Sequence, residues 1–436
     1  MPTKTSTSYT ARPSRLSATE IVAGIAGAKL TCERVVRDCL EEIEARDAPI
    51  QAWQYLDPEQ VIAQARALDR TSRRGALTGV PFAIKDIIDT CDMPTEYGSP
   101  IYAGHRPCAD AACVALSRRA GGILMGKTVT TEFANVYPGK TRNPFDPQRT
   151  PGGSSSGSAA AVAACMVPLA IGTQTTGSTI RPASFCGVFG YRPTHGDLRC
   201  VGVKEAAGSL DTLGLIARSV EDVALYRDVL LGIEPAPLPP EDWVPRIGFC
   251  RTHLWSILEP YTQDLLEQAV VRLERAGARV VEVELPAAFE RIQSIHRSIS
   301  SFEFARNFTW EIDNHWEKLS ERLRDGRLKH GLACTFEEYV EARSAAERLR
   351  TLLAEAFGAC DVLLTAAATG EAPIGLDSTG NAAPCAIWTT THVPQITLPV
   401  FQGPNGLPVG AQLVARRNDD RRLLCAARWV HRQLAQ

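Results

Sequence analysis

One lysine and two turns rich in glycine and serine are the residues of this 436-residue chain best suited to chemistry. Lys85 is the only charged residue between Arg74 and Asp86, and it follows an apolar run. Burial disfavours the ammonium form of a lysine, and the neutral amine is a base. Two alternatives remain open: a side chain that extends to solvent, or an ion pair with Asp86 or Asp89.

The second candidate segment is Pro151-Gly-Gly-Ser-Ser-Ser-Gly-Ser158, which leads into the Ala-rich run of residues 158–165. Glycines free the backbone, serines supply hydroxyl groups, and the Ala-rich run predicts a closely packed helix. A flexible linker is one alternative, although a linker should not lead directly into a buried helix. A phosphate-binding loop is another, but the Gly-Lys-Ser/Thr ending and the dinucleotide-binding glycine spacing are both absent from the sequence.

The third segment, Gly172-Thr-Gln-Thr-Thr-Gly-Ser-Thr-Ile-Arg-Pro182, presents Ser178 in a turn of small residues. A polar surface turn is the alternative interpretation. Hydrolysis of an amide needs a nucleophile, a base for its proton and hydrogen-bond donors for the developing oxyanion. This one turn offers a nucleophile together with backbone donors.

The three motifs, in this order, resemble the signature of the amidase signature family. In that family the relay serine lies 24 residues before the nucleophile, and 178 − 154 = 24 selects Ser154 among the neighbouring serines. The segments 87–90, 93–96 and 180–183 are most similar to malonamidase-type members. The resemblance extends over nearly the whole chain, from the N-terminal helices to residues 406–410.

This resemblance implies a fold and a mechanism. We expect an α/β fold, a single α/β/α domain with a large mixed central sheet over residues 18–436, preceded by a flexible tail at residues 1–17. We expect no metal and no organic cofactor. The implied catalytic residues are Lys85 as base, Ser154 as relay after a cis peptide bond, and Ser178 as nucleophile. The oxyanion hole would consist of the backbone amides of Thr175, Thr176, Gly177 and Ser178.

Two residues beside Ser178 bear on the substrate. The family usually has glycine where this chain has Thr176, and a threonine forced to positive φ would be strained. Arg181 is a candidate for binding a substrate carboxylate in a bidentate fork, as the resemblance to malonamidase-type enzymes suggests. The alternative for Arg181 is a structural role in which it bonds to the glycine-rich loops.

The surrounding elements follow from periodicity and turn residues. Apolar spacing predicts helices over residues 17–70, 262–276 and 420–436. Apolar runs predict buried strands near residues 79–85, 120–126, 246–250, 361–365 and 395–400. A proline-rich linker occupies residues 234–241. A helical cap-like region at about 291–357 is expected to cover the pocket mouth. Its aromatic residues are candidates for the pocket lining, although most are expected in the core: Phe302, Phe304, Phe308, Trp310 and Trp316.

Composition excludes several classes of protein. Lys plus Arg total 47 against 49 for Asp plus Glu, so there is no electrostatic signature for nucleic acid binding. The longest small-apolar stretch, residues 159–171, is too short to cross a bilayer. Thirteen scattered cysteines without a Cys-x-x-Cys pair predict neither a disulfide framework nor a zinc site, and favour a cytoplasmic setting. His195 and His392 lack the Gly-x-Ser-x-Gly context of a serine–histidine hydrolase.

We therefore predict an enzyme that hydrolyses a small-molecule amide through an acyl-enzyme, with a dicarboxylic monoamide as the suggested substrate. Three alternatives stay open. The same triad would serve a carbamate or aryl-acylamide hydrolase, and an amidotransferase subunit would act on charged tRNA. A non-enzymatic anion-binding protein would use the two Gly/Ser loops. The oligomeric state is not fixed by the sequence, and a homodimer is retained as an option.

Overall fold

The computed structural model describes residues 12–72, 75–240 and 243–435, and one mixed β-sheet runs through them. Its 11 strands have the spatial order β1-β3-β2-β4-β6-β5-β10-β11-β9-β7-β8. The strands are β1 (Trp53–Leu56), β2 (Pro81–Lys85), β3 (Ile123–Thr128), β4 (Leu169–Gln174), β5 (Phe189–Arg192), β6 (Thr212–Ala217), β7 (Arg246–Phe249), β8 (Arg279–Glu282), β9 (Val362–Ala366), β10 (Gln395–Gln402) and β11 (Pro408–Ala415).

Fifteen α-helices are assigned in the described residues. They are α1 (Ala18–Ala26), α2 (Cys32–Ile50), α3 (Pro58–Arg70), α4 (Ala112–Arg119), α5 (Ser156–Ala163), α6 (Ile180–Phe185), α7 (Val220–Leu231), α8 (Pro260–Arg275), α9 (Ile292–Asn307), α10 (Thr309–His315), α11 (Glu321–Leu323), α12 (Lys329–Ala333), α13 (Phe336–Ala356), α14 (Ala383–Thr390) and α15 (Asp420–Leu434). None of these described helices is both long and apolar enough to span a membrane.

The centre of the sheet is buried on both faces. Every residue of β2, β3, β4 and β6 is buried, although successive side chains of a strand point to opposite faces. Helices therefore cover both faces, as in other α/β proteins. Strand β2 runs parallel to β3 and β4, while β6 is antiparallel to β4 and β5. The α/β fold with a large mixed sheet is confirmed.

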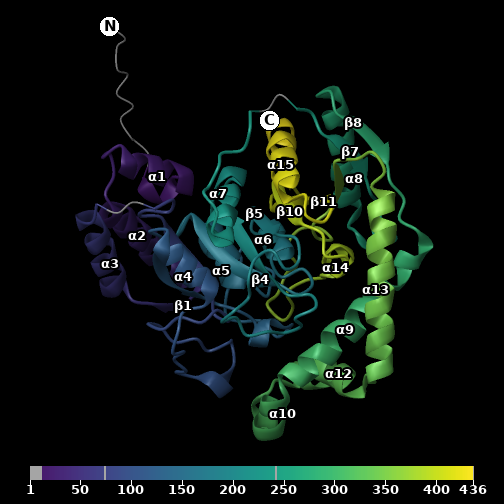
Figure 1. The fold of residues 1–436 in the computed structure, drawn as a ribbon, viewed down its shortest axis with the longest axis horizontal. Helices are drawn as coiled ribbons and strands as arrows, with labels where there is room; N and C mark the ends of the chain where they lie inside the picture. Colours follow the sequence, from purple (N-terminus) through teal and green to yellow (C-terminus); the bar gives the residue numbers. More distant parts are fainter. Residues whose placement is uncertain (1–11, 73–74, 241–242, 436) are drawn as a thin grey trace.

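The region predicted as cap-like, at about 291–357, forms helices α9 to α13. Figure 1 shows α9, α10, α12 and α13 extending as a helical arm beside the sheet. Helix α9 packs against α12, α13 and α14, so the arm is joined to the body of the protein through α14. Phe304 and Phe308 are buried, their rings stack with centroids 4.1 Å apart, and both belong to the main hydrophobic core that includes the sheet.

The tail predicted at residues 1–17 requires a correction. Residues 1–11 lie outside the described residues, but Pro13–Arg15 form a short 3-10 helix in which Pro13 and Ser14 are buried. Ser17 caps α1 in a capping box with Glu20. The folded part of the chain therefore begins before residue 18, because the polar Ser and Arg residues here serve as caps and ion-pair partners.

Candidate active site

Lys85 ends the central strand β2 with its side chain fully buried. Its Nζ lies 2.6 Å from Ser154 Oγ and 2.8 Å from Thr173 Oγ1. Burial lowers the pKa of Lys85 to about 7, with the Asp211 carboxylate acting in the opposite direction. A large fraction of this side chain is therefore an uncharged amine near neutral pH.

Neither structural alternative for Lys85 holds. The Asp86 carboxylate lies 3.5 Å from Nζ of Lys127, the neighbouring buried lysine on β3. Asp89 accepts a hydrogen bond from the Tyr97 hydroxyl at 2.8 Å. Both carboxylates thus have other partners, and the Lys85 side chain is directed at two hydroxyl groups.

The serine-rich loop leads into α5 and separates its three serines. The peptide bond between Gly153 and Ser154 is cis, as the family resemblance implies. Ser155 Oγ donates to Thr173 O at 3.3 Å, and Ser156 Oγ donates to Gly152 O at 2.8 Å. Their hydroxyl groups are therefore bonded to the backbone, whereas the Ser154 hydroxyl lies against Lys85.

A glycine at position 152 is required by two independent features. Its φ is +81°, in the left-handed region that side chains other than glycine rarely adopt. A Cβ there would also lie 2.8 Å from the Cα of Pro182, on the segment that follows Ser178. The serine loop and the nucleophile turn thus approach each other too closely for a side chain.

The turn that carries Ser178 lies between β4 and α6. Ser178 borders a cleft and is 8% exposed, and its carbonyl accepts the N–H of Ser155 at 3.2 Å. Within the described part of the chain, the amides of Thr176, Gly177 and Ser178 donate to no protein acceptor. These amides are available to a ligand beside the Ser178 hydroxyl.

The positive φ considered for Thr176 does not occur. Thr176 and Gly177 are both absent from the positive-φ residues of the described chain, so the threonine is accommodated without backbone strain. Gly177 is small for a different reason, because a Cβ there would lie 3.0 Å from Cβ and Sγ of Cys385 on α14. The Thr176 side chain borders the cleft, with Oγ1 at 3.2 Å from His296 Nε2.

Gln174 is a supporting residue that the sequence analysis missed. Its Oε1 accepts the N–H groups of Thr179 and Ile180 at 2.9 and 3.0 Å, the first amides of α6. Side-chain capping of this kind satisfies donors that have no partner inside the helix. An amide side chain at the end of an otherwise apolar strand was the available indication.

The cleft beside Ser178 has a volume of about 390 Å³ and carries three guanidinium groups, those of Arg181, Arg322 and Arg327. No acidic side chain borders it among the described residues. The arginines also form no ion pair within the described residues, and burial lowers the pKa of Arg181 and of Arg327 to about 10. Arg322 and Arg327 belong to the helical arm and were not identified from the sequence.

Arg181 makes the loop contacts of the structural alternative. Its Nη1 donates to Gly380 O at 2.8 Å, and its Nη2 donates to Gly153 O at 2.6 Å and Thr379 Oγ1 at 3.0 Å. Both hydrogens of Nη2 are therefore engaged, and the bidentate fork considered for a substrate carboxylate is not free in this arrangement. One hydrogen of Nη1, the buried Nε–H, which has no hydrogen-bond partner among the described residues, and the positive charge remain for a ligand.

His195 and His392 lie apart from this site. Their rings stack with centroids 4.0 Å apart, and their Nε2 atoms contact the carbonyl groups of Gly208 and Ser209. Burial lowers the pKa of His195 to about 4 and that of His392 to about 2. Neither histidine borders the cleft beside Ser178, which agrees with the missing Gly-x-Ser-x-Gly context.

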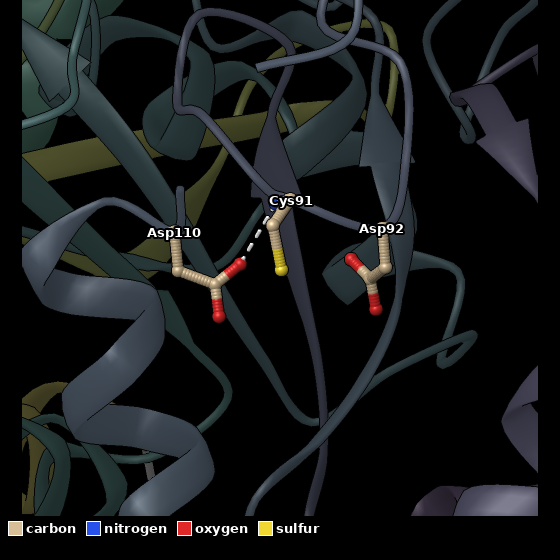
Figure 2. A group of neighbouring side chains, drawn as sticks. All are labelled: Cys91, Asp92 and Asp110. Carbon is tan, nitrogen blue, oxygen red and sulfur yellow. Dashed lines mark hydrogen bonds between the residues drawn. The ribbon is translucent and has the colours of Figure 1, made fainter. Parts of the chain in front are cut away.

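Among the residues that the structure describes, one group of side chains has donor atoms close enough for a metal ion: Cys91, Asp92 and Asp110 (Figure 2). The Arg118 guanidinium bonds both oxygens of Asp92 at 2.7 Å and lies 3.3 Å from Asp110. Partial burial and the hydrogen bond to Asp110 raise the pKa of the Cys91 thiol, which disfavours the thiolate that binds metals. This group is better described as two carboxylates bridged by one arginine.

Comparisons with known proteins identify the family and the fold. The amidase family profile matches residues 34–424. A glutamyl-tRNA(Gln) amidotransferase subunit of Chloroflexus aggregans is 33% identical, with 92% of each chain covered. The crystal structure of an amidase superposes with a TM-score of 0.88 at 29% identity, covering 96% of this chain and 100% of that one. The native peptide amidase from Stenotrophomonas maltophilia gives 0.81 at 29% identity, covering 96% and 97%. The chain is therefore a member of the amidase signature family of hydrolases.

Proposed function

We propose that this protein hydrolyses a carboxylic amide through Lys85, Ser154 and Ser178. The observation that carries the proposal is the 2.6 Å contact between Lys85 Nζ and Ser154 Oγ in a fully buried setting, one loop away from Ser178. A neutral amine accepts the Ser154 proton while Ser154 Oγ accepts the proton of Ser178. The Ser178 oxygen then bonds to the carbonyl carbon of the substrate.

The tetrahedral intermediate collapses when the C–N bond breaks. The departing nitrogen takes a proton returned from Lys85 through Ser154, and the acyl group stays on Ser178 until water hydrolyses the ester. The unpaired amides of Thr176, Gly177 and Ser178 are the donors proposed for the oxyanion, together with that of Thr175. Removal of one donor of this kind typically costs roughly 100-fold or more in rate.

We further propose that the acyl part of the substrate carries a carboxylate, as in a dicarboxylic monoamide of the malonamidase type. Three guanidinium groups border the cleft, one of them on the buried Arg181, and no acidic side chain borders it among the described residues. This concentration of positive charge supports the proposal, because it favours an anionic ligand. A carbamate or aryl-acylamide with a neutral, bulkier acyl group would leave these charges uncompensated. Turnover of succinamic acid, acetamide, acetanilide and ethyl carbamate would rank the alternatives directly.

Arg181→Ala is expected to lower kcat/KM on succinamic acid by about 10- to 150-fold, since a hydrogen bond to a charged group contributes roughly 1.5 to 3 kcal/mol. The methyl ester of succinamic acid, which lacks the charge, should lose far less. Arg181→Lys should restore only part of the difference, because a point charge does not reproduce the guanidinium contacts. Equal losses on both substrates would mean that Arg181 only supports the loops.

Thr176→Gly is expected to leave turnover of small acyl groups within a few-fold and to raise kcat/KM for amides with branched acyl groups. The Thr176 side chain borders the cleft, while the His296 contact to Thr175 O does not depend on it. Kinetics on succinamic acid and 2,2-dimethylsuccinamic acid measure the change. Loss of turnover on every substrate would show instead that the threonine is required.

An amidotransferase subunit that acts on charged tRNA is the second candidate function, favoured by the 33% identity to the Chloroflexus aggregans protein. A free amino acid amide such as glutamine carries an ammonium beside its carboxylate, and the described cleft offers no carboxylate for it. Co-purification of the native protein with partner subunits, and ammonia transfer by that complex, would favour this second function.

A further inference from the structure

In the turn at residues 175–178, side chains from other helices bind the carbonyl oxygens of the peptide groups, on the side opposite to the N–H groups. Thr175 O lies 3.0 Å from His296 Nε2, and Thr176 O accepts a hydrogen bond from Thr389 Oγ1 at 2.7 Å. In a planar trans peptide the C=O and the next residue's N–H point in opposite directions. A donor that fixes the oxygen of Thr175 thus fixes the direction of the Thr176 N–H, and Thr389 does the same for the Gly177 N–H.

The His296 contact has a defined direction. A carbonyl oxygen only accepts hydrogen bonds, so the bond to Thr175 O requires the tautomer with the proton on Nε2. In that tautomer Thr176 Oγ1, 3.2 Å from the same atom, can only accept from it. The side chain is buried on α9, and burial lowers the pKa of His296 to about 4. The imidazole is therefore neutral under working conditions and has this single N–H to donate.

The Thr389 contact is also directional. Its hydroxyl, fully buried on α14, accepts from Gln174 Nε2 at 3.2 Å and from Gln395 Nε2 at 3.3 Å. Because both amide groups donate to Oγ1, the hydroxyl proton is left for Thr176 O. Gln174 also caps α6 directly after Ser178, so the same network holds the turn at both ends.

We propose that His296 and Thr389 are positioning residues for the oxyanion hole, which orient the Thr176 and Gly177 amides through the carbonyl groups of the turn. This rests on the proposed function of Ser178. The side chains come from α9 and α14, more than one hundred residues from the turn in sequence, and neither borders the cleft. They act through the backbone and do not touch the substrate.

The test pairs each deletion of a donor with a conservative variant. Thr389→Val removes the donor at nearly constant volume, and Thr389→Ser keeps it. His296→Leu removes the N–H, and His296→Gln retains an N–H at a similar reach. The substrates are succinamic acid and p-nitrophenyl acetate. The acetyl group of the second is small and uncharged, so its hydrolysis measures the reactivity of Ser178 without a contribution from the arginines of the cleft.

We expect Thr389→Val and His296→Leu each to lower kcat by about 10- to 100-fold with KM within twofold, since misplaced catalytic groups cost rates of this order. The Ser and Gln variants should recover most of the loss. Inhibition by succinic semialdehyde, whose adduct with Ser178 places an oxyanion in the hole, should weaken by a similar factor. Inhibition by the product succinate should not change, and a purely structural role would not produce this split.

Wild-type kcat in both Thr389→Val and His296→Leu would overturn the inference, as would equal weakening of semialdehyde and succinate inhibition. Loss of folded protein in one of the two variants leaves the other as an independent test, and thermal unfolding of each is measured alongside. Failure of the proposed function gives a different result. In that case the wild type and the Ser178→Ala variant would hydrolyse each of the two substrates at the same rate.

Discussion

Ser178→Ala is expected to lower kcat for amide hydrolysis by roughly 10⁴- to 10⁶-fold, the range observed when a serine nucleophile is removed from a catalytic unit. The hydroxyl is the atom that bonds to the substrate carbon, and no other hydroxyl is proposed for that step. The loss is measured by ammonia release from succinamic acid under single-turnover and steady-state conditions. The melting temperature should stay close to that of the wild type, because a single oxygen at the border of a cleft is removed.

A matched control is available in the same cleft. Ser378 also borders it, is exposed, and its Oγ accepts the N–H of Gly380 at 3.1 Å. Ser378→Ala should retain turnover within a few-fold. Turnover by purified Ser178→Ala at a rate near that of the wild type would eliminate the proposed mechanism.

Lys85→Met carries the second large effect, an expected loss of about 10²- to 10⁴-fold in kcat, the contribution typical of a positioned general base. Methionine has a similar length and no proton to exchange, so the buried volume is nearly preserved. Lys85→Arg should not restore activity, because arginine stays protonated and cannot act as a base. Activity in the arginine variant close to that of the wild type would show that position 85 contributes charge only.

The pH profile gives an independent check on the same lysine. Only the neutral amine is a base, and the pKa of Lys85 is lowered to about 7, so kcat/KM should rise as pH increases through about 7 and then level off. At pH 5 nearly all of the lysine is protonated, and the rate should fall by about tenfold per pH unit below the midpoint. An optimum in acid solution would contradict a lysine base.

The sequence was sufficient to predict the elements whose pattern is local. The apolar runs that predicted β2, β3, β7, β9 and β10 form strands within a few residues of the expected bounds. Strands β1, β4, β5, β6, β8 and β11 were not predicted. Segments of four to eight residues carry little periodicity, and β4, β5, β6 and β11 each contain a glycine, which weakens a strand pattern. Strand order was likewise inaccessible, since it depends on pairings between segments far apart in the chain.

The same distinction applies to the site. The 24-residue spacing implied by the family resemblance selected Ser154 over Ser155, and the hydrogen bonds of the two serines are consistent with that choice. Arg327 and His296 approach the nucleophile turn only through the packing of the helical arm, more than one hundred residues away in sequence. No local pattern indicates such contacts, because His296 on α9 and Arg327 in the π-helical segment Arg324–Leu328 reach the turn only through the packing of distant parts of the chain.

The construction of the cleft from two distant parts of the chain has a consequence for divergence within such enzymes. The proposed catalytic groups lie at the end of β2 and in the loops before α5 and α6, whereas Arg322 and Arg327 lie on the helical arm. Mutations in the arm can therefore change which acyl groups are accepted while leaving the bond-breaking apparatus intact. Gene duplication followed by mutation of residues 316–333 would therefore be a short route from one substrate to another. A chimera that carries this segment from a relative should show the acyl-group preference of that relative.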